Sequence, residues 1–305
     1  MTEPASSTTT SIHRLNADRR LPFGPAGKLA WLALNRLNNA RPYQDVDPRL
    51  QIRDFRCDAL DARAAGLPAG ISPSRLLSDL FWITLPWSAI HTELGGPIHV
   101  FDIGCGTGQY GPRLLSWSGE RIVEYVGTDI QVPSSWPDDP RLTFVRAEAS
   151  TLTAFPPAAN FIMSQSTIEH IDDDLRFFQH VRDHVQARRE PTLQVHLCPS
   201  AGCLPTYLWH GVRQYTPRTL SRITSLFADS DLWLFRLGGH ACNRLHFQFI
   251  TGPHFIWRTG DRRAKEPAPY QARLVRALAE DMSQPQQSPA FYALVIHTHP
   301  RSRLF

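Results

Sequence analysis

An acidic residue followed by alternating glycines is the feature of this chain that points most directly to chemistry. The largely apolar residues 98–101 lead into Asp102, and Gly104, Gly106 and Gly108 follow at alternate positions. Such a run predicts a short buried strand. Glycines permit a tight turn and, because they lack Cβ, let a ligand lie against the backbone. Open α/β sheets bind ligands at the carboxyl ends of their strands, so this turn predicts a site for a nucleoside-like cofactor.

Two classes of cofactor use such a turn, and Asp102 distinguishes them. Residues 106–111 also match G-x-G-x-x-G, the dinucleotide fingerprint, and Asp129 follows at a spacing suited to ribose in either class. A carboxylate is unfavourable beside the pyrophosphate of a nicotinamide cofactor. The sulfonium and ammonium groups of S-adenosylmethionine attract one instead. We therefore expect S-adenosylmethionine as the cofactor, with an NAD-dependent oxidoreductase as an alternative.

The segment 102–108 resembles motif I of the class I S-adenosylmethionine-dependent methyltransferases, and later segments resemble that family's other elements in the same order. They are the second strand at 125–130, the third strand and its turn at 142–149, the fourth strand and its loop at 161–171, the fifth strand at 192–197, and a Thr-Pro helix start at 215–220. The last of these is found in many small-molecule methyltransferases. The match covers roughly residues 96–237, and a final strand near 291–298 extends it.

This resemblance implies an α/β fold with a Rossmann-like, mostly parallel sheet and an antiparallel final strand. It also implies a set of cofactor-binding residues: Asp102, Gly104, Gly106, Gly108, Asp129, Ile130, Glu148, Ala149 and Gln165. Two positions depart from the family pattern. Glu148 stands where Asp is usual and can still accept a hydrogen bond, and Asn160 replaces the usual Asp before the fourth strand.

Methyl transfer from a sulfonium is a displacement at carbon, so the protein chiefly aligns a nucleophile with the methyl group. For a hydroxyl acceptor, a general base adds roughly 10²–10⁴-fold. Glu169 and His170 are candidates because they follow the predicted fourth strand, where the pocket should open. His170 is preferred because an ordinary imidazole titrates near neutral pH. The alternative is that both residues begin a helix and make local hydrogen bonds.

A second cluster of aromatic and polar residues follows the predicted fifth strand. Trp209, His210, Arg213 and Tyr215 combine aromatic faces with polar groups, which suits a hydroxylated ring such as a sugar. Arg213 would pair with a phosphate or carboxylate of the acceptor. We therefore expect a small-molecule or glycan acceptor that is methylated on oxygen. The alternatives are that Trp209 and Tyr215 belong to the core, and that the fold binds a partner without catalysis.

Residue types that bind zinc occur without a suitable spacing. His240, Cys242 and His246, together with Cys198 and Cys203, form no tight ligand pair, so no metal site is expected.

The chain divides into three predicted parts. Residues 1–22 are rich in Ser, Thr and Arg and are expected to be disordered. Residues 23–95 are expected to form an N-terminal helical extension, with helices at 25–38 and after the N-cap Ser72, separated by a loop-like segment at 41–70. Residues 96–305 are expected to form the cofactor-binding domain.

Composition excludes several other classes. The net charge of +4 is modest and no block of five like charges occurs, so no nucleic-acid partner is expected. No apolar run reaches eighteen residues, which predicts that no helix spans a membrane. Without a convincing signal peptide, a cytoplasmic location is the expectation.

Overall fold

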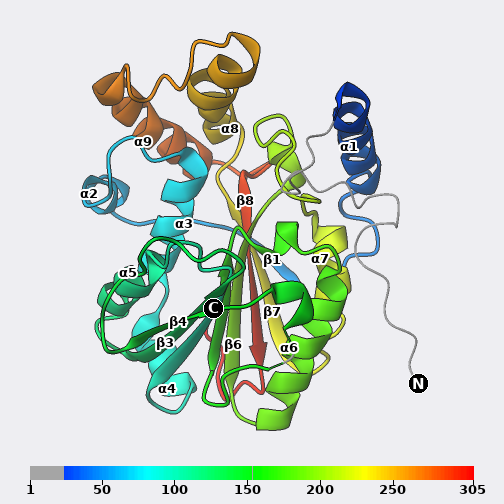
Figure 1. Cartoon of the computed structure of the whole chain (residues 1–305), viewed down its shortest axis with the longest axis vertical. Helices are drawn as coiled ribbons and strands as arrows, with labels where there is room; N and C mark the ends of the chain where they lie inside the picture. The colour runs from blue at the N-terminus through cyan, green and yellow to red at the C-terminus, as the bar shows by residue number, and fades with distance from the viewer. Residues whose placement is uncertain (1–23, 153) are drawn as a thin grey trace.

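One eight-stranded sheet organises the molecule (Figure 1). The computed structural model describes residues 24–152 and 154–305, so the disorder expected for residues 1–22 lies outside the described part. Neighbouring strands follow the order β1-β7-β8-β6-β5-β2-β3-β4. All pairings are parallel except the two made by β8, which runs antiparallel to β6 and β7. The Rossmann-like fold with an antiparallel final strand, expected from the sequence, is therefore confirmed.

The sheet contains the strands predicted from the sequence, within a few residues of their expected bounds, together with β1, which was not predicted. Their bounds are β1 Gln51–Asp54, β2 Ile98–Ile103, β3 Ile122–Asp129, β4 Leu142–Arg146, β5 Phe161–Gln165, β6 Thr192–Pro199, β7 Ser230–Leu237 and β8 Phe291–Thr298. Every residue of β5, β6 and β8 is buried, as expected for central strands covered on both faces.

Helices cover both faces of the sheet. Their bounds are α1 Pro25–Asn38, α2 Leu60–Ala65, α3 Pro73–Thr84, α4 Trp87–Glu93, α5 Tyr110–Trp117, α6 Asp174–Arg188, α7 Pro217–Thr224, α8 His240–His246, the π-helical η5 Phe247–Ile256 and α9 Pro267–Ser283. Short 3₁₀ turns are η2 Ala149–Thr151, η3 Ile168–His170 and η4 Ala201–Cys203. The successive β2 residues Val100 and Phe101 enter separate apolar clusters, one on each face of the sheet.

Residues 41–70 correct one expectation. They were expected to be loop-like, yet they contain β1 and α2, and β1 pairs with β7 to form an edge of the sheet. The sequence of β1 gives little sign of a strand, because Ile52 is its one apolar residue and all four residues are half-buried. The N-terminal extension is therefore joined to the sheet that follows it, and the division of the chain at residue 96 stays a prediction.

A helical cap lies beyond the end of the sheet at which the parallel strands finish (Figure 1). It consists of α2 and α3 from the N-terminal extension and of α8 and α9, which come between β7 and β8; α8 packs on α9 and on α3, and α2 packs on α9. Indole Nε1 of Trp82, in α3, donates a hydrogen bond of 3.0 Å to Oε1 of Gln165 at the end of β5. The cap is thereby fixed to the end of β5, the strand that pairs with β2 beside the predicted cofactor turn. Within the described ranges every helix is too short or too polar to cross a membrane.

Candidate active site

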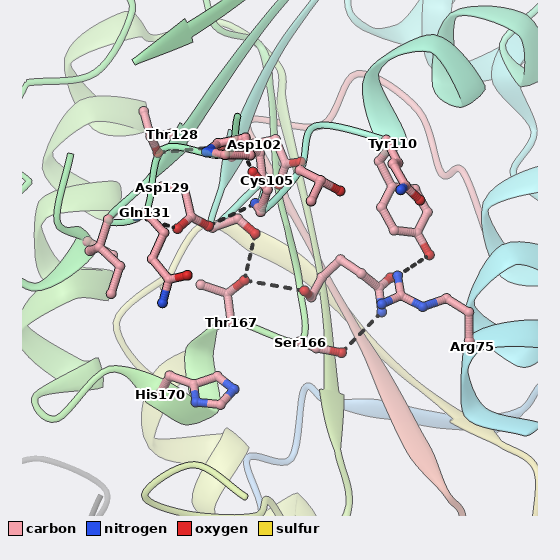
Figure 2. A pocket seen from close by; sticks show the side chains of 18 of the residues that line it. Arg75, Asp102, Cys105, Tyr110, Thr128, Asp129, Gln131, Ser166, Thr167 and His170 are labelled. Atoms are coloured by element: carbon pink, nitrogen blue, oxygen red, sulfur yellow. Dashed lines mark hydrogen bonds between the residues drawn. The ribbon is translucent and has the colours of Figure 1, made fainter. Parts of the chain in front are cut away.

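A cavity of about 1070 Å³ opens at the carboxyl ends of β2, β3 and β5 (Figure 2). Eight of the nine predicted cofactor-binding residues line it: Asp102, Gly104, Gly106, Asp129, Ile130, Glu148, Ala149 and Gln165. Gly108 does not, because it faces the protein. A Cβ on Gly108 would lie 2.6 Å from the ring of Phe144, so this glycine permits close packing beneath the turn.

The turn after β2 is held by the neighbouring strand. The backbone N–H groups of Gly104 and Cys105 both donate to the carbonyl of Thr128, at 2.7 and 2.9 Å. Gly106 has a φ of +56°, and no atom lies within 4 Å of the place where its Cβ would stand. The backbone at Gly106 is therefore open to close approach by a ligand.

Asp129 ends β3 with its carboxylate fixed at the cavity wall. Its Oδ2 accepts from the N–H of Gly106 and its Oδ1 from the N–H of Gln131, each at 2.8 Å. Each carboxylate oxygen can accept more than one hydrogen bond. The arrangement leaves acceptor capacity for a pair of hydroxyl groups on a ligand.

Asp102 is only 1% exposed, although it borders the cavity. Its Oδ2 accepts a short hydrogen bond from the hydroxyl of Tyr125, while its Oδ1 has no hydrogen-bond partner. Burial, which disfavours the charged form, raises the pKa of Asp102 to about 7. The hydrogen bond from Tyr125 opposes this rise in pKa, and the nearby charge of Asp129 adds to it.

The cap adds a polar wall to the cavity, made by residues that were not predicted as site residues from the sequence. Arg75 of α3 lines the cavity and donates at 2.9 Å to the hydroxyl of Tyr110 (Figure 2). The Tyr110 hydroxyl in turn donates at 2.6 Å to Asp79. Arg113 also lines the cavity, 3.5 Å from Asp79. Arg75 lies outside the segment that carries the resemblance, and no local spacing links it to Asp102. Only the packing of the cap brings them together.

The two candidate catalytic residues occupy different depths. His170 lines the cavity, whereas Glu169 is fully buried behind it, with 3.8 Å between Oε1 of Glu169 and Nε2 of His170. His210, predicted as an acceptor-binding residue, also lines the cavity, and its Nε2 lies 3.7 Å from the same Glu169 oxygen. The imidazole rings of His170 and His210 meet edge to face, with 4.7 Å between their centres. The structure therefore joins residues that we had placed in separate predicted clusters.

Arg213 and Tyr215 correct the prediction that they contact the acceptor. Both side chains are fully buried and neither lines the cavity. Arg213 donates to the carbonyls of Ile171 and Asp172 and lies 3.3 Å from a carboxylate oxygen of Asp174. The Tyr215 hydroxyl donates to Asp174 at 2.9 Å. These residues hold the turn that carries His170.

Trp209 is also outside the cavity lining. Its indole Nε1 donates to the carbonyl of Lys28 in α1, and its ring packs edge to face on Phe255. Its position indicates contact between the 207–215 loop, α1 and η5 rather than a surface for the acceptor.

Comparisons with known proteins find likeness at the level of three-dimensional structure. No protein-family model matches the sequence, and no curated protein matches it. Among solved structures, the [4+2]-cyclase SpnF is 13% identical, covering 78% of this chain and 91% of its own, with a TM-score of 0.42. An S-adenosylmethionine-dependent methyltransferase from Mesorhizobium loti is 15% identical, covering 69% of this chain and 95% of its own, with a TM-score of 0.39.

A third similar structure is the 1,6-didemethyltoxoflavin-N1-methyltransferase of Burkholderia thailandensis, solved with S-adenosylhomocysteine. It is 14% identical, covers 71% of this chain and 78% of its own, and has a TM-score of 0.39. Such distant likeness carries no argument about activity. The fold assignment rests on this chain's own strand order, and the site is argued from its own residues.

Proposed function

We propose that this protein is an S-adenosylmethionine-dependent methyltransferase that methylates a hydroxyl of a small-molecule or glycan acceptor. The observation that carries the proposal is the Asp129 carboxylate, which two backbone N–H groups fix at the wall of a cavity that begins at the glycine turn. Asp129 ends β3, which corresponds to the second strand of a nucleotide-binding sheet of this type. A carboxylate at that position is placed to accept hydrogen bonds from the two ribose hydroxyls of a nucleoside.

The residues of the turn fit this cofactor. The open space at Gly106 admits a ligand against the backbone, and the unpartnered Oδ1 of Asp102 offers a buried acceptor for a cationic group. A dinucleotide would bring a pyrophosphate toward the carboxylate of Asp102, which like charge disfavours. S-adenosylmethionine supplies an activated methyl group on a sulfonium sulfur, so the protein needs no group to activate the donor.

The acceptor would occupy the part of the cavity near His170 and His210. The cavity, at about 1070 Å³, slightly exceeds the range of about 300–1,000 Å³ usual for ligand pockets, which leaves room for an acceptor beside a cofactor. His170 is the candidate base for the acceptor hydroxyl, because its side chain borders this space and Glu169 lies behind it. Glu169 does not reach the cavity, so it would position His170 and would not contact the acceptor itself.

Calorimetric titration with S-adenosylhomocysteine tests the cofactor part of this proposal. Asp129→Ala removes the ribose-facing carboxylate, and losing a hydrogen bond to a charged group costs about 1.5–3 kcal/mol, so the dissociation constant should rise at least tenfold. Asp183→Ala is the matched control, since Asp183 is an exposed residue of α6 that pairs with Arg182. Saturable binding of NADH with no binding of S-adenosylhomocysteine would contradict the proposal and favour an oxidoreductase.

Measurements of turnover test the second part of the proposal, which is methyl transfer to an acceptor. Incubation with S-adenosylmethionine and panels of hydroxylated acceptors should release S-adenosylhomocysteine in proportion to the methylated product. Tight cofactor binding without turnover on any panel would favour a binding role over catalysis.

A further inference from the structure

Glu169, His170 and His210 form a compact group of metal-ligating side chains at the wall of the cavity. One ligand atom from each lies within 4.8 Å of the others, and in the part of the chain that the structure describes no other three such residues form a group of this kind. The residues come from two segments, η3 and the 207–215 loop, that are forty residues apart in the chain.

The Glu169 carboxylate is the unusual member of this group. Its side chain has no exposed surface, and neither of its oxygens has a hydrogen-bond partner. The imidazole nitrogens of His170 and His210 stand 3.8 and 3.7 Å from Oε1, which is too long for a hydrogen bond. A buried carboxylate without hydrogen bonds is strongly disfavoured unless a cation or another partner compensates it.

The spacing suits a shared cation. Zinc and similar ions bind imidazole nitrogen and carboxylate oxygen at about 2.0–2.2 Å, which places neighbouring ligand atoms about 3.0–3.5 Å apart. The two separations from Glu169, 3.7 and 3.8 Å, exceed this range by a few tenths of an ångström, and the three ligand atoms as a set lie within 4.8 Å of one another. Rotation of the imidazole side chains would bring all three ligand atoms onto one ion.

The backbone holds the two segments in this relation. The N–H of Val212 donates at 2.8 Å to the Glu169 carbonyl, and Trp31 Nε1 donates at 3.0 Å to the Gly211 carbonyl. Gly211 has a φ of +66°, and a Cβ there would lie 2.8 Å from the Glu169 carbonyl oxygen. Glycine at this position is therefore required for His210 to reach Glu169.

From this geometry we propose that Glu169, His170 and His210 bind a divalent first-row transition-metal ion at the acceptor end of the cavity. Two imidazoles and one carboxylate favour such ions over magnesium or calcium, which prefer all-oxygen sites. His170 and His210 line the cavity, so the remaining coordination positions would face it. This is a site that the sequence analysis did not expect.

The proposed site also changes how the acceptor would be activated, a step that rests on the proposed function. As a metal ligand, His170 would no longer act as the base. The ion would instead lower the pKa of an acceptor hydroxyl that ligates it, as metals do for bound water. The hydroxyl proton leaves to solvent, the oxygen forms its bond to the methyl carbon, and the electron pair of the carbon–sulfur bond stays on sulfur.

Titration of the full-length, untagged and chelator-treated protein with Mn²⁺ tests the site, with the free-ion electron paramagnetic resonance signal as the measurement. We expect saturable binding of one ion per chain. Glu169→Gln, nearly isosteric but uncharged, should weaken this binding by at least about tenfold. His91→Gln in α4 is the matched control and should leave the affinity unchanged. Circular dichroism shows whether each variant is folded.

A second variant is needed because substitution of the buried Glu169 could disturb folding. His210→Gln alters a side chain that is 40% exposed and should weaken Mn²⁺ binding to a similar extent. Absence of binding to the wild-type protein, or binding unaffected by both substitutions, overturns the site. Methyl transfer that persists undiminished in chelator-treated protein overturns the catalytic role of the ion and leaves the proposed methyltransferase intact. Failure to bind S-adenosylhomocysteine would instead overturn the proposed function while leaving the Mn²⁺ result valid.

Discussion

Asp102 lies in an environment unusual for an aspartate, since only 1% of its surface is exposed. An exposed aspartate is fully ionised at neutral pH, but burial raises the pKa of Asp102 to about 7. The hydroxyl of Tyr125 satisfies one of its oxygens, and the other, Oδ1, has no partner. A cationic ligand beside this oxygen would favour the charged form. Ligand binding and proton release from Asp102 should therefore be coupled.

This coupling predicts that the affinity for S-adenosylmethionine depends on pH. Protonated Asp102 offers no charge to the ligand, so affinity should rise as pH increases through about 7 and level off above it. If only the ionised form binds, the association constant increases about tenfold between pH 6 and pH 8. Calorimetric titration at a series of pH values measures the change.

Asp102→Asn is the control for this prediction. The asparagine side chain keeps an oxygen that can accept the hydrogen bond from Tyr125, but it cannot ionise. The variant should bind S-adenosylmethionine more weakly than the wild-type protein at pH 8. It should also lose the increase in affinity with pH that is attributed to Asp102, while any pH dependence due to other groups remains. Equal pH dependence in the two proteins would contradict the coupling.

At the scale of elements, a buried network holds the turn η3 against the 207–215 loop. Arg213 contacts the carbonyls of Ile171 and Asp172 and the carboxylate of Asp174 at the start of α6, and Tyr215 donates to the same carboxylate. The side chains of Arg213, Asp174 and Tyr215 do not line the cavity. Their joint effect is to fix the positions from which His170 and His210 face the cavity.

Arg213→Met should therefore destabilise the protein strongly. The substitution leaves the Asp174 carboxylate buried beside an apolar group, and breaking a buried ion pair from one side costs about 3–5 kcal/mol. Urea unfolding followed by circular dichroism measures the free energy of unfolding. Arg182→Met, which breaks an exposed pair with Asp183, is the comparison and should change it by about 1 kcal/mol or less. Similar losses in both variants would argue against a structural role for the network.

Elements with strong local signals could be predicted from the sequence, and those fixed by packing could not. The central strands are recognisable because strands buried on both faces are rich in apolar residues, as in the run 291–296 of β8. The edge strand β1 has no such pattern, since its pairing with β7 alone defines it. The same division holds in the site. The glycine turn is local, whereas Arg75 and the meeting of Glu169 with His210 depend on contacts between distant segments.

At the scale of the whole molecule, the N-terminal extension and the sheet share one core. The α3 side chains Leu76, Leu77, Leu80, Phe81 and Trp82 are buried in the same apolar cluster as Phe161 and Val195 of the central strands. Trp82 also donates to Gln165 in the cavity wall, and β1 extends the sheet. The cap thus contributes to the fold as well as to the cavity.

A fragment of residues 96–305 should accordingly fail to fold alone, although the resemblance to known methyltransferases begins there. Removing the five α3 side chains loses about 8–15 kcal/mol of stabilisation from apolar burial. This loss is as large as the whole free energy of unfolding of a typical domain, about 5–15 kcal/mol. Circular dichroism and urea unfolding of the purified fragment test this, with residues 24–305 as the control that should unfold cooperatively. Adding residues 24–95 as a separate chain should restore a folded complex, because the lost contacts are noncovalent. A cooperatively folded 96–305 fragment that binds S-adenosylhomocysteine would show that the N-terminal extension is dispensable.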